Sequence, residues 1–180
     1  IDVQTVVTAG NPFIEIIRTA LQRQHDLVIK TVTPEGMFHR TFFGSTDMHL
    51  LRKCPTPLWL IKAGEPDMFR RILVALDPNM EHGIKHDVGV NLLKLATSLA
   101  EWDGAELMIV HAWHAYEEEK LKKHMEPQKF EEYVNSWGQE SSKRTWRFTS
   151  AFEREIKPKC IHLVHGEPGF VIPKFAKDHE

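Results

Sequence analysis

The pattern Gly-x-Pro-x-x-x-Ile-x-x-x-Ala occurs twice in this chain, with identical spacing in both copies. The first copy begins at Gly10 and the second at Gly166, so the two lie 156 residues apart. A fixed period of this kind indicates an internal duplication. Because the period nearly fills the 180 residues, we interpret the chain as the later part of one copy followed by the earlier part of the next. We therefore expect it to belong to a longer protein.

Composition narrows the class of protein. A hydrophobic content of 42% is enough for a packed core, whereas a formal charge of -2 with dispersed basic residues favours no nucleic-acid partner. Apolar runs such as residues 107–110 are far shorter than the roughly 20 residues of a membrane span, and no leader opens the chain. We therefore expect a cytoplasmic protein without a membrane partner. Cys54 and Cys160 predict no structural disulfide in that compartment.

Predicted strands and helices alternate along the first part of the chain. The hydrophobic pattern and turn signals predict a strand at 2–7, a helix from Pro12 to about Arg23, a strand at 27–29 buried on both faces, a loop at 33–43, a helix capped by Ser45 or Thr46 and running to about Lys53, and a strand at 58–61.

The same alternation continues after a plausible linker at 63–69. We expect a strand at 71–77, a helix at 85–102 whose apolar face is Val88, Leu92, Leu95, Ala96 and Leu99, a strand at 107–112, a long amphipathic helix from Pro127 whose stripe reaches Phe152 and Ile156, a strand at 161–164, and a helix opened by Gly166 and Pro168. Alternation of this kind predicts a parallel α/β sheet, in which ligands bind beyond the carboxyl ends of the strands.

Several landmarks occur in order and in register. They are Arg71 to Asp77, Gly166-x-Pro168, Asp26 to Ile29, and Gly44-Ser45 followed by Pro57-Leu58. Together they resemble the universal stress protein family over essentially the whole chain, and residues 48–59 resemble its tandem-domain members. The resemblance implies Rossmann-like domains of the adenine nucleotide alpha hydrolase-like kind, with strand order 3-2-1-4-5. It also implies that residues 1–64 are the second half of a first domain, 65–70 a linker, and 71–180 the first part of a second domain.

ATP is the cofactor that the resemblance implies, with its phosphates held by a glycine loop after the fourth strand. Gly44, Ser45 and Thr46 match the last part of that motif, at the start of a helix that suits an anion. Thr31 and Pro34 stand where the first two glycines belong, and proline has no N–H to donate. Serine or threonine at a helix start also serves as a simple cap.

The second copy carries the adenosine side of the implied site. Asp77 follows its first strand, Ala112 lies where the family contacts the base, and Gly166 follows its third strand. The matching phosphate loop would begin after residue 180. An acid at a strand end is also a common turn former or helix cap, so the residue alone leaves the role of Asp77 open.

No catalytic or metal-binding motif stands out. The candidate metal ligands His111, His114, Cys160, His162 and His165 lack a four-ligand pattern, and solvated or hydrogen-bonded histidines are the simpler interpretation. Cys54 has two basic neighbours but no partner cysteine nearby. The aromatic stripe after Pro127 fits core and interface packing, with a ligand groove as the alternative.

Three hypotheses follow. The first is a non-enzymatic stress-response protein that binds an adenine nucleotide and acts through protein partners or self-association, as a homodimer or by domain pairing. The second is a slow ATPase or phosphotransferase that uses the second phosphate loop. The third is a structural pairing module that has lost its ligand. For the fold, two partial domains and a single rebuilt, permuted sheet remain alternatives.

Overall fold

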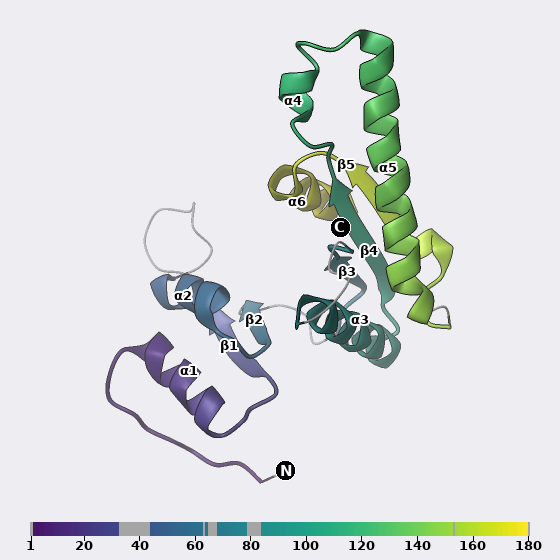
Figure 1. Cartoon of the computed structure of the whole chain (residues 1–180). Coiled ribbons are helices and arrows are strands. Elements are labelled where there is room, and N and C mark those ends of the chain that lie inside the picture. Colours follow the sequence, from purple (N-terminus) through teal and green to yellow (C-terminus); the bar gives the residue numbers. More distant parts are fainter. Residues whose placement is uncertain are drawn as a thin grey trace. The chain divides into compact units, whose positions relative to one another are not determined.

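The computed structural model describes residues 2–32, 44–62, 64, 68–78, 84–152 and 154–179. The chain divides into two compact units, Ile1–Asp67 and Met68–Glu180. Both alternate helices with parallel strands (Figure 1), so the predicted α/β class is confirmed. Over the described residues each unit has its own parallel sheet, one of two strands and one of three. No helix in those ranges is both long and apolar enough to cross a bilayer.

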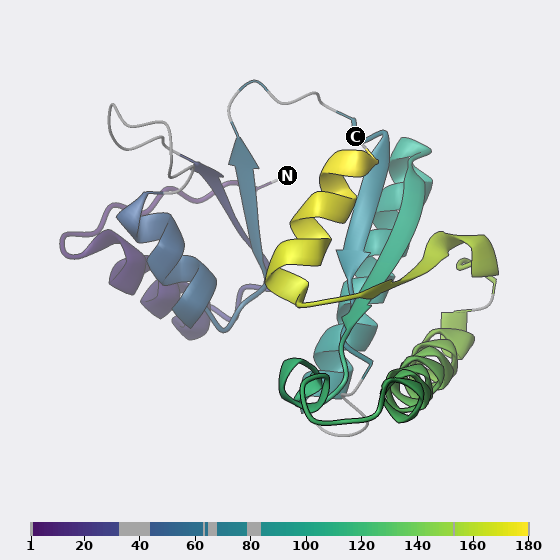
Figure 2. The same cartoon turned by 90° about the horizontal axis from the view of Figure 1, so that it is seen from above.

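The first unit is a two-stranded parallel sheet with two helices. Its elements are α1 (Pro12–Gln22), β1 (Val28–Val32), α2 (Ser45–Lys53) and β2 (Leu58–Lys62), and β1 pairs with β2. Both helices lie on the same side of the strands (Figure 2). They contact each other through Phe13, whose ring stacks on His49 at 4.4 Å and lies 5.1 Å from the ammonium of Lys53.

Two predictions for this unit are wrong. Residues 2–9 form no strand, because a strand needs a hydrogen-bonded neighbour and β1 pairs only with β2 among the described residues. Ile29 is 57% exposed, because the helices cover only one face of the sheet, so β1 is not buried on both faces. The predicted loop at 33–43 and most of the linker at 63–69 lie outside the described residues.

The second unit is a three-stranded parallel sheet in the order β3-β4-β5, with β4 at its centre. The chain runs through β3 (Arg71–Ala75), α3 (Ile84–Asp103), β4 (Glu106–Trp113), α4 (Glu118–Leu121), α5 (Pro127–Thr149), short 3₁₀ turns at Ser150–Phe152 and Pro158–Cys160, β5 (Ile161–His165) and α6 (Pro168–Asp178). Helices α3, α5 and α6 all contact β4. The full order 3-2-1-4-5 is not contained in either sheet.

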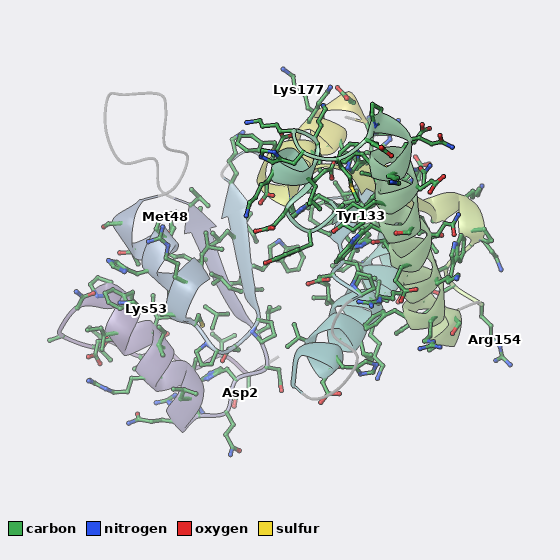
Figure 3. The ribbon with its side chains drawn as sticks, turned by 45° about the horizontal axis from the view of Figure 1, so that its top comes forward. Asp2, Met48, Lys53, Tyr133, Arg154 and Lys177 are labelled. Carbon is green, nitrogen blue, oxygen red and sulfur yellow. The ribbon has the colours of Figure 1, made fainter. Side chains whose placement is uncertain are left out.

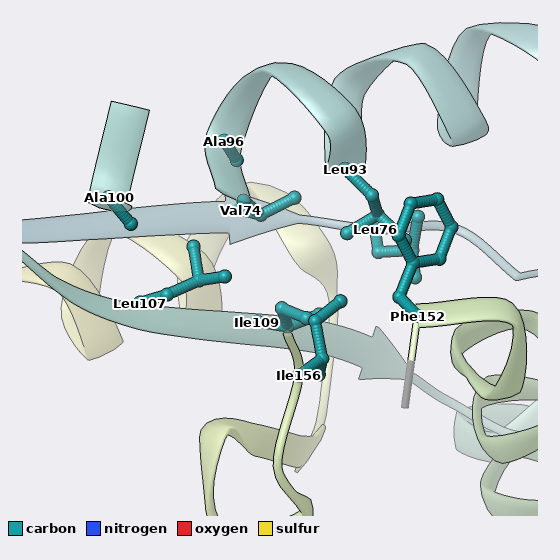
Figure 4. Packing of buried hydrophobic residues seen from close by; sticks show 9 residues of the cluster. All are labelled: Val74, Leu76, Leu93, Ala96, Ala100, Leu107, Ile109, Phe152 and Ile156. Carbon is teal, nitrogen blue, oxygen red and sulfur yellow. The ribbon is translucent and has the colours of Figure 1, made fainter. Parts of the chain in front are cut away.

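The core of the second unit lies between α3 and the sheet. Leu93, Ala96 and Ala100 of α3 face Val74, Leu76, Leu107 and Ile109, and Phe152 and Ile156 close the cluster (Figure 4). The predicted apolar face of this helix is therefore largely wrong. Of its members Ala96 is buried, but Val88, Leu92 and Leu95 are exposed, because the helix turns its smaller residues toward the closely packed strands.

The long amphipathic helix is shorter than predicted. Helix α5 ends at Thr149, and a 3₁₀ turn takes the chain through Phe152. Phe152 and Ile156 are buried, as their place in the stripe suggests, but they reach the core from beyond the helix end.

The repeated pattern has the same local structure in both units. Gly10 and Gly166 have φ values of +142° and +133°, a region that residues with a side chain rarely adopt. Pro12 and Pro168 each begin a helix of 11 residues, the position at which the missing N–H costs nothing. The repeated spacing thus corresponds to the same turn and helix in both units.

Candidate functional site

A cavity of about 430 Å³ opens at the carboxyl ends of β3 and β4 in the second unit. This is the edge of a parallel sheet at which ligands are expected. Its lining comes from the ends of both strands and from helices α5 and α6: Ala75, Leu76, Asp77, His111, Ala112, Trp113, His114, Trp137, Glu140, Ser141, Arg144, Pro168 and Ile172.

Two of the predicted site residues, Asp77 and Ala112, line this cavity. The carboxylate of Asp77 can accept hydrogen bonds from the hydroxyl or amino groups of a ligand. Gly166 is not part of the lining. Its N–H donates to the carbonyl of Trp113 at 2.8 Å, which holds the turn from β5 into α6, and Pro168 and Ile172 of that helix reach the cavity instead.

His111 is a buried polar side chain in the wall of the cavity. Its side chain is 3% exposed, and Nδ1 lies 3.0 Å from the carbonyl oxygen of Leu76. Because a carbonyl only accepts, Nδ1 carries the proton and Nε2 presents a lone pair, for which the described residues supply no partner. Burial lowers the pKa of His111, although the Leu76 carbonyl and the charge of Asp77 act in the opposite direction. The imidazole is therefore neutral near pH 7.

Trp113 is held in place from several sides. Its ring stacks on His165 with a centroid distance of 4.5 Å, and a Cβ at position 138 would lie only 2.9 Å from its edge, so Gly138 lets the indole approach α5. His165 is oriented by Glu118, whose Oε2 lies 2.9 Å from His165 Nε2 and also accepts the N–H of Ala115 at 3.0 Å. The result is a fixed aromatic wall on the cavity.

The loop after β4 is fastened to the neighbouring elements by further contacts. The hydroxyl of Tyr133 on α5 (labelled in Figure 3) donates to the carbonyl of Tyr116 at 2.9 Å, and His114 Nε2 lies 3.4 Å from the Glu167 carboxylate. Burial raises the pKa of Glu118, but hydrogen bonds from His165 and from the Ala115 N–H outweigh it and leave the pKa below its ordinary value. Glu118 is thus a carboxylate at neutral pH.

Helix α5 contributes polar groups that sequence reasoning did not assign to the site. Glu140 accepts a hydrogen bond from Arg144 Nε at 2.9 Å, and this bond lowers the pKa of Glu140. Trp137, Ser141 and Arg144 succeed one another at spacings of four and three, which places them on one helix face. That spacing was the available signal, since Trp137 and Ser141 belong to the predicted stripe.

The other predicted site residues, Gly44, Ser45 and Thr46, belong to the first unit. Gly44 is the N-cap of α2 and Ser45 its first residue, with no capping hydrogen bond from a side chain, so the prediction that Ser45 or Thr46 caps this helix is wrong. Instead, the N–H of Gly44 donates to Oδ2 of Asp47 at 3.2 Å. The second oxygen, Oδ1, lies 2.6 Å from the ammonium of Lys30.

The arrangement of α2 does not fit a bound phosphate. Asp47 is 1% exposed and already accepts the N–H that would face an anion, while Lys30 already has its counter-ion. A phosphate placed there would meet a buried carboxylate of like charge. Of the residues that the resemblance implies for a nucleotide site, Asp77 and Ala112 line the cavity of the second unit.

The candidate metal ligands do not gather. Within the described ranges no group of three or more histidine, cysteine, aspartate or glutamate side chains is placed to hold a metal ion. His162 packs against the ring of Phe175 at 5.0 Å, and Cys160 lies in the 3₁₀ turn before β5 rather than on the strand. Cys54 and Cys160 are both free thiols.

The parallel strands, the helical crossovers and a cavity at the strand ends define an α/β protein of Rossmann-like fold. The model of the universal stress protein family matches residues 1–62. Universal stress protein E of Salmonella typhi is 28% identical over 172 residues, which are 96% of this chain and 54% of that protein. Universal stress protein E of Escherichia coli K12 is 34% identical over 96 residues, which are 53% of this chain and 30% of that protein. Residues 1–62 therefore belong to the universal stress protein family, and similarity to its members extends over most of the chain.

Solved structures agree on the fold. A protein of Pseudomonas aeruginosa UCBPP-PA14 that is assigned to the universal stress proteins superposes with a TM-score of 0.66 at 19% identity, over 91% of this chain and 52% of that one. A functionally unknown protein of Pseudomonas aeruginosa PAO1 superposes with a TM-score of 0.69 at 18% identity, over 94% of this chain and 54% of that one. These three matches cover most of this chain, but the chain spans only about half the length of each of the matched proteins.

Proposed function

We propose that this chain is the part of a tandem stress-response protein that binds an adenine nucleotide in the cavity of the second unit. The tandem arrangement is supported by the turn-and-helix repeat at Gly10 and Gly166. Nucleotide binding is supported by one observation above all: Asp77 and Ala112, which the family resemblance implies, line the same cavity.

The chemistry of the cavity suits a nucleoside. Trp113, Trp137, Pro168 and Ile172 supply flat or apolar surface for a base, and Asp77 supplies an acceptor for a ribose hydroxyl or an exocyclic amine. Its volume of about 430 Å³ falls within the roughly 300–1,000 Å³ of typical small-molecule sites.

We propose a regulatory rather than a catalytic role, carried out in the cytoplasm. Bound nucleotide would favour one arrangement of the protein over another, and it can do so only if its affinity for the two arrangements differs. The competing hypothesis of a slow ATPase or phosphotransferase predicts release or transfer of phosphate. A phosphate-release assay on the whole protein separates the two hypotheses. Phosphate release that persists in the purified protein and is reduced by Asp77→Asn would favour the enzyme.

Isothermal titration calorimetry with ADP tests the nucleotide site directly. Asp77→Asn keeps the size of the side chain but removes its charge, and should weaken binding by about ten- to a hundredfold, since a hydrogen bond to a charged group contributes about 1.5–3 kcal/mol. Asp87→Asn is the matched control, because Asp87 lies in the same unit on α3 and does not line the cavity. Absence of ADP binding by the parent chain, or equal affinities of both variants, would refute the proposal.

A second proposal is self-association through the outer side of α3. Val88, Leu92, Leu95 and Trp102 are exposed, Trp102 to 87%, and their spacing of four, three and seven residues forms one stripe along the helix. A helix that is apolar on both sides is normally buried, and a heptad-like stripe suits a second helix of the same kind. We therefore propose a second copy of the chain as the occupant.

Sedimentation velocity tests this association. Leu95→Glu should shift the chain toward monomer, whereas Lys94→Glu, which adds negative charge beside the stripe without removing an apolar side chain, should leave the assembly intact. A parent chain that remains monomeric at high micromolar concentration would rule the interface out.

A further inference from the structure

The start of α2 in the first unit holds a buried ion pair within the chain itself. Asp47 accepts the N–H of Gly44 at 3.2 Å through Oδ2, and its Oδ1 lies 2.6 Å from Lys30 Nζ. The ammonium also donates to the carbonyl of Thr31 at 2.9 Å. Asp47 is 1% exposed and Lys30 is 23% exposed, so both charges are largely removed from water.

A helix N-terminus favours negative charge because its first N–H groups have no partner within the helix and the helix dipole is positive there. A bound phosphate meets that requirement from outside the chain. In this chain the negative charge is supplied by Asp47, three residues after the N-cap, and Lys30 from the central part of β1 neutralises it. The two residues also tie α2 to β1, because they come from different elements.

We propose that Asp47 and Lys30 are an internal replacement for a bound anion, so that the first unit holds no nucleotide phosphate at the start of α2. Nucleotide binding is then confined to the cavity of the second unit, a consequence that rests on the proposed function. The first unit keeps Gly44 and Ser45 at the start of the helix, but the charges there are balanced without a ligand.

The proposal predicts that removing the internal charge opens an anion site. In Asp47→Asn the side chain keeps its shape and can still accept the N–H of Gly44, but the ammonium of Lys30 loses its counter-ion. Inorganic phosphate should then bind beside Lys30 and the first N–H groups of α2. In Lys30→Met/Asp47→Asn both charges are gone, and phosphate should find no counter-ion.

The test is a phosphate titration of the full chain at constant ionic strength, followed by ¹⁵N-resolved NMR of the Gly44, Ser45 and Thr46 amides. We expect no saturable shift in the parent chain, a saturable shift in Asp47→Asn, and none in the double variant. A saturable shift in the parent chain would overturn the proposal, and so would a titration of Asp47→Asn that matches that of the double variant.

A comparison of the variants' stabilities tests the pairing of Asp47 with Lys30 even if Asp47→Asn folds poorly. Breaking a buried ion pair on one side leaves an uncompensated charge, whereas replacing both partners removes that penalty. The double variant should therefore be more stable than Asp47→Asn alone, and an equal or lower stability would contradict the pairing. Because these signals belong to the first unit and the probe is phosphate, failure here is distinguishable from failure of ADP to bind the second unit.

Discussion

The orientation of α3 gives the most direct test of the fold. Leu93 and Leu95 are the same residue type on the same helix, two positions apart. Leu93 is fully buried against Val74, Leu76 and their neighbours in the core (Figure 4), whereas Leu95 is 42% exposed. Replacing each by alanine in turn removes the same atoms from two different environments.

The expected costs follow from those environments. A fully buried leucine cut to alanine loses its transfer free energy and leaves a cavity, which together cost about 2–5 kcal/mol. Complete burial and a tightly packed surrounding cluster place Leu93→Ala at about 3 kcal/mol. The same change at a half-exposed helix position costs about 1 kcal/mol or less, because little surrounding structure is left unpacked and alanine is the better helix former.

Urea and thermal unfolding, followed by circular dichroism at low micromolar concentration, measure the difference. For a unit of roughly a hundred residues, 1 kcal/mol corresponds to about 4 °C in Tm, so Leu93→Ala should lower Tm by about 12 °C and Leu95→Ala by about 4 °C at most. The low concentration keeps any association through the outer stripe out of the result. Equal losses, or a larger loss for Leu95→Ala, would show that the helix faces the sheet with its other side.

The pH dependence of stability and two glycine substitutions test the surroundings of the cavity. Because the folded pKa of Glu118 is below its ordinary 4.5, its contribution to stability is present above pH 4.5 and lost as the pH falls through the folded value; Glu118→Gln should flatten that part of a pH–stability curve measured by urea unfolding. The pKa of His111 is also lowered, from 6.5, so the unfolded chain takes up a proton first and stability should already fall as the pH drops below 6.5; a rise in stability over that range would contradict a neutral, buried imidazole. Gly169→Ala meets no atom within 4 Å and should gain up to about 1 kcal/mol, whereas Gly138→Ala must displace Trp113 and should show no such gain and weaker ADP binding by calorimetry. Tighter or unchanged ADP binding in Gly138→Ala would show that Trp113 is not a wall of the site.

Local patterns predicted most of the elements, because their causes lie within a few residues. The spacing of Gly166 and Pro168 predicts a turn followed by a helix, and the structure has both. The strand predicted at residues 2–7 failed for the opposite reason. Its valines suit a strand, but a strand exists only beside a partner, and alternation along one segment carries no information about that partner.

The face of α3 could not be derived from its own sequence. Leucines or valines occur on both sides of the helix, so the apolar pattern is compatible with either side facing the sheet. The choice is made by close packing: Ala96 and Ala100 let the helix approach the strands, and Leu93 fills the space between them. Those contacts depend on the size of side chains on β3 and β4, which no pattern within residues 84–103 contains.

The candidate site was predictable where topology alone decides. Asp77 follows β3 and Ala112 lies at the carboxyl end of the neighbouring parallel strand β4, so they had to lie at one edge of the sheet. The contribution of Arg144 was not predictable in the same way, because it depends on how α5 crosses the strand ends. Asp47 was missed for a third reason: an acid in the first turn of a helix is ordinary, and only the structure brings Lys30 to it across the sheet.

The two units therefore differ in what they require from a ligand, although they share a duplicated turn and helix. In the first unit, the charge that a helix start favours is supplied by Asp47 and neutralised by Lys30, so this unit has no electrostatic need for an anion. In the second unit, His111 presents a buried nitrogen without a partner among the described residues, and Asp77, Trp113 and Trp137 line the cavity beside it. An incomplete set of interactions is what a ligand can complete. This difference supports the proposal that a nucleotide binds in the second unit, through its nucleoside rather than its phosphates.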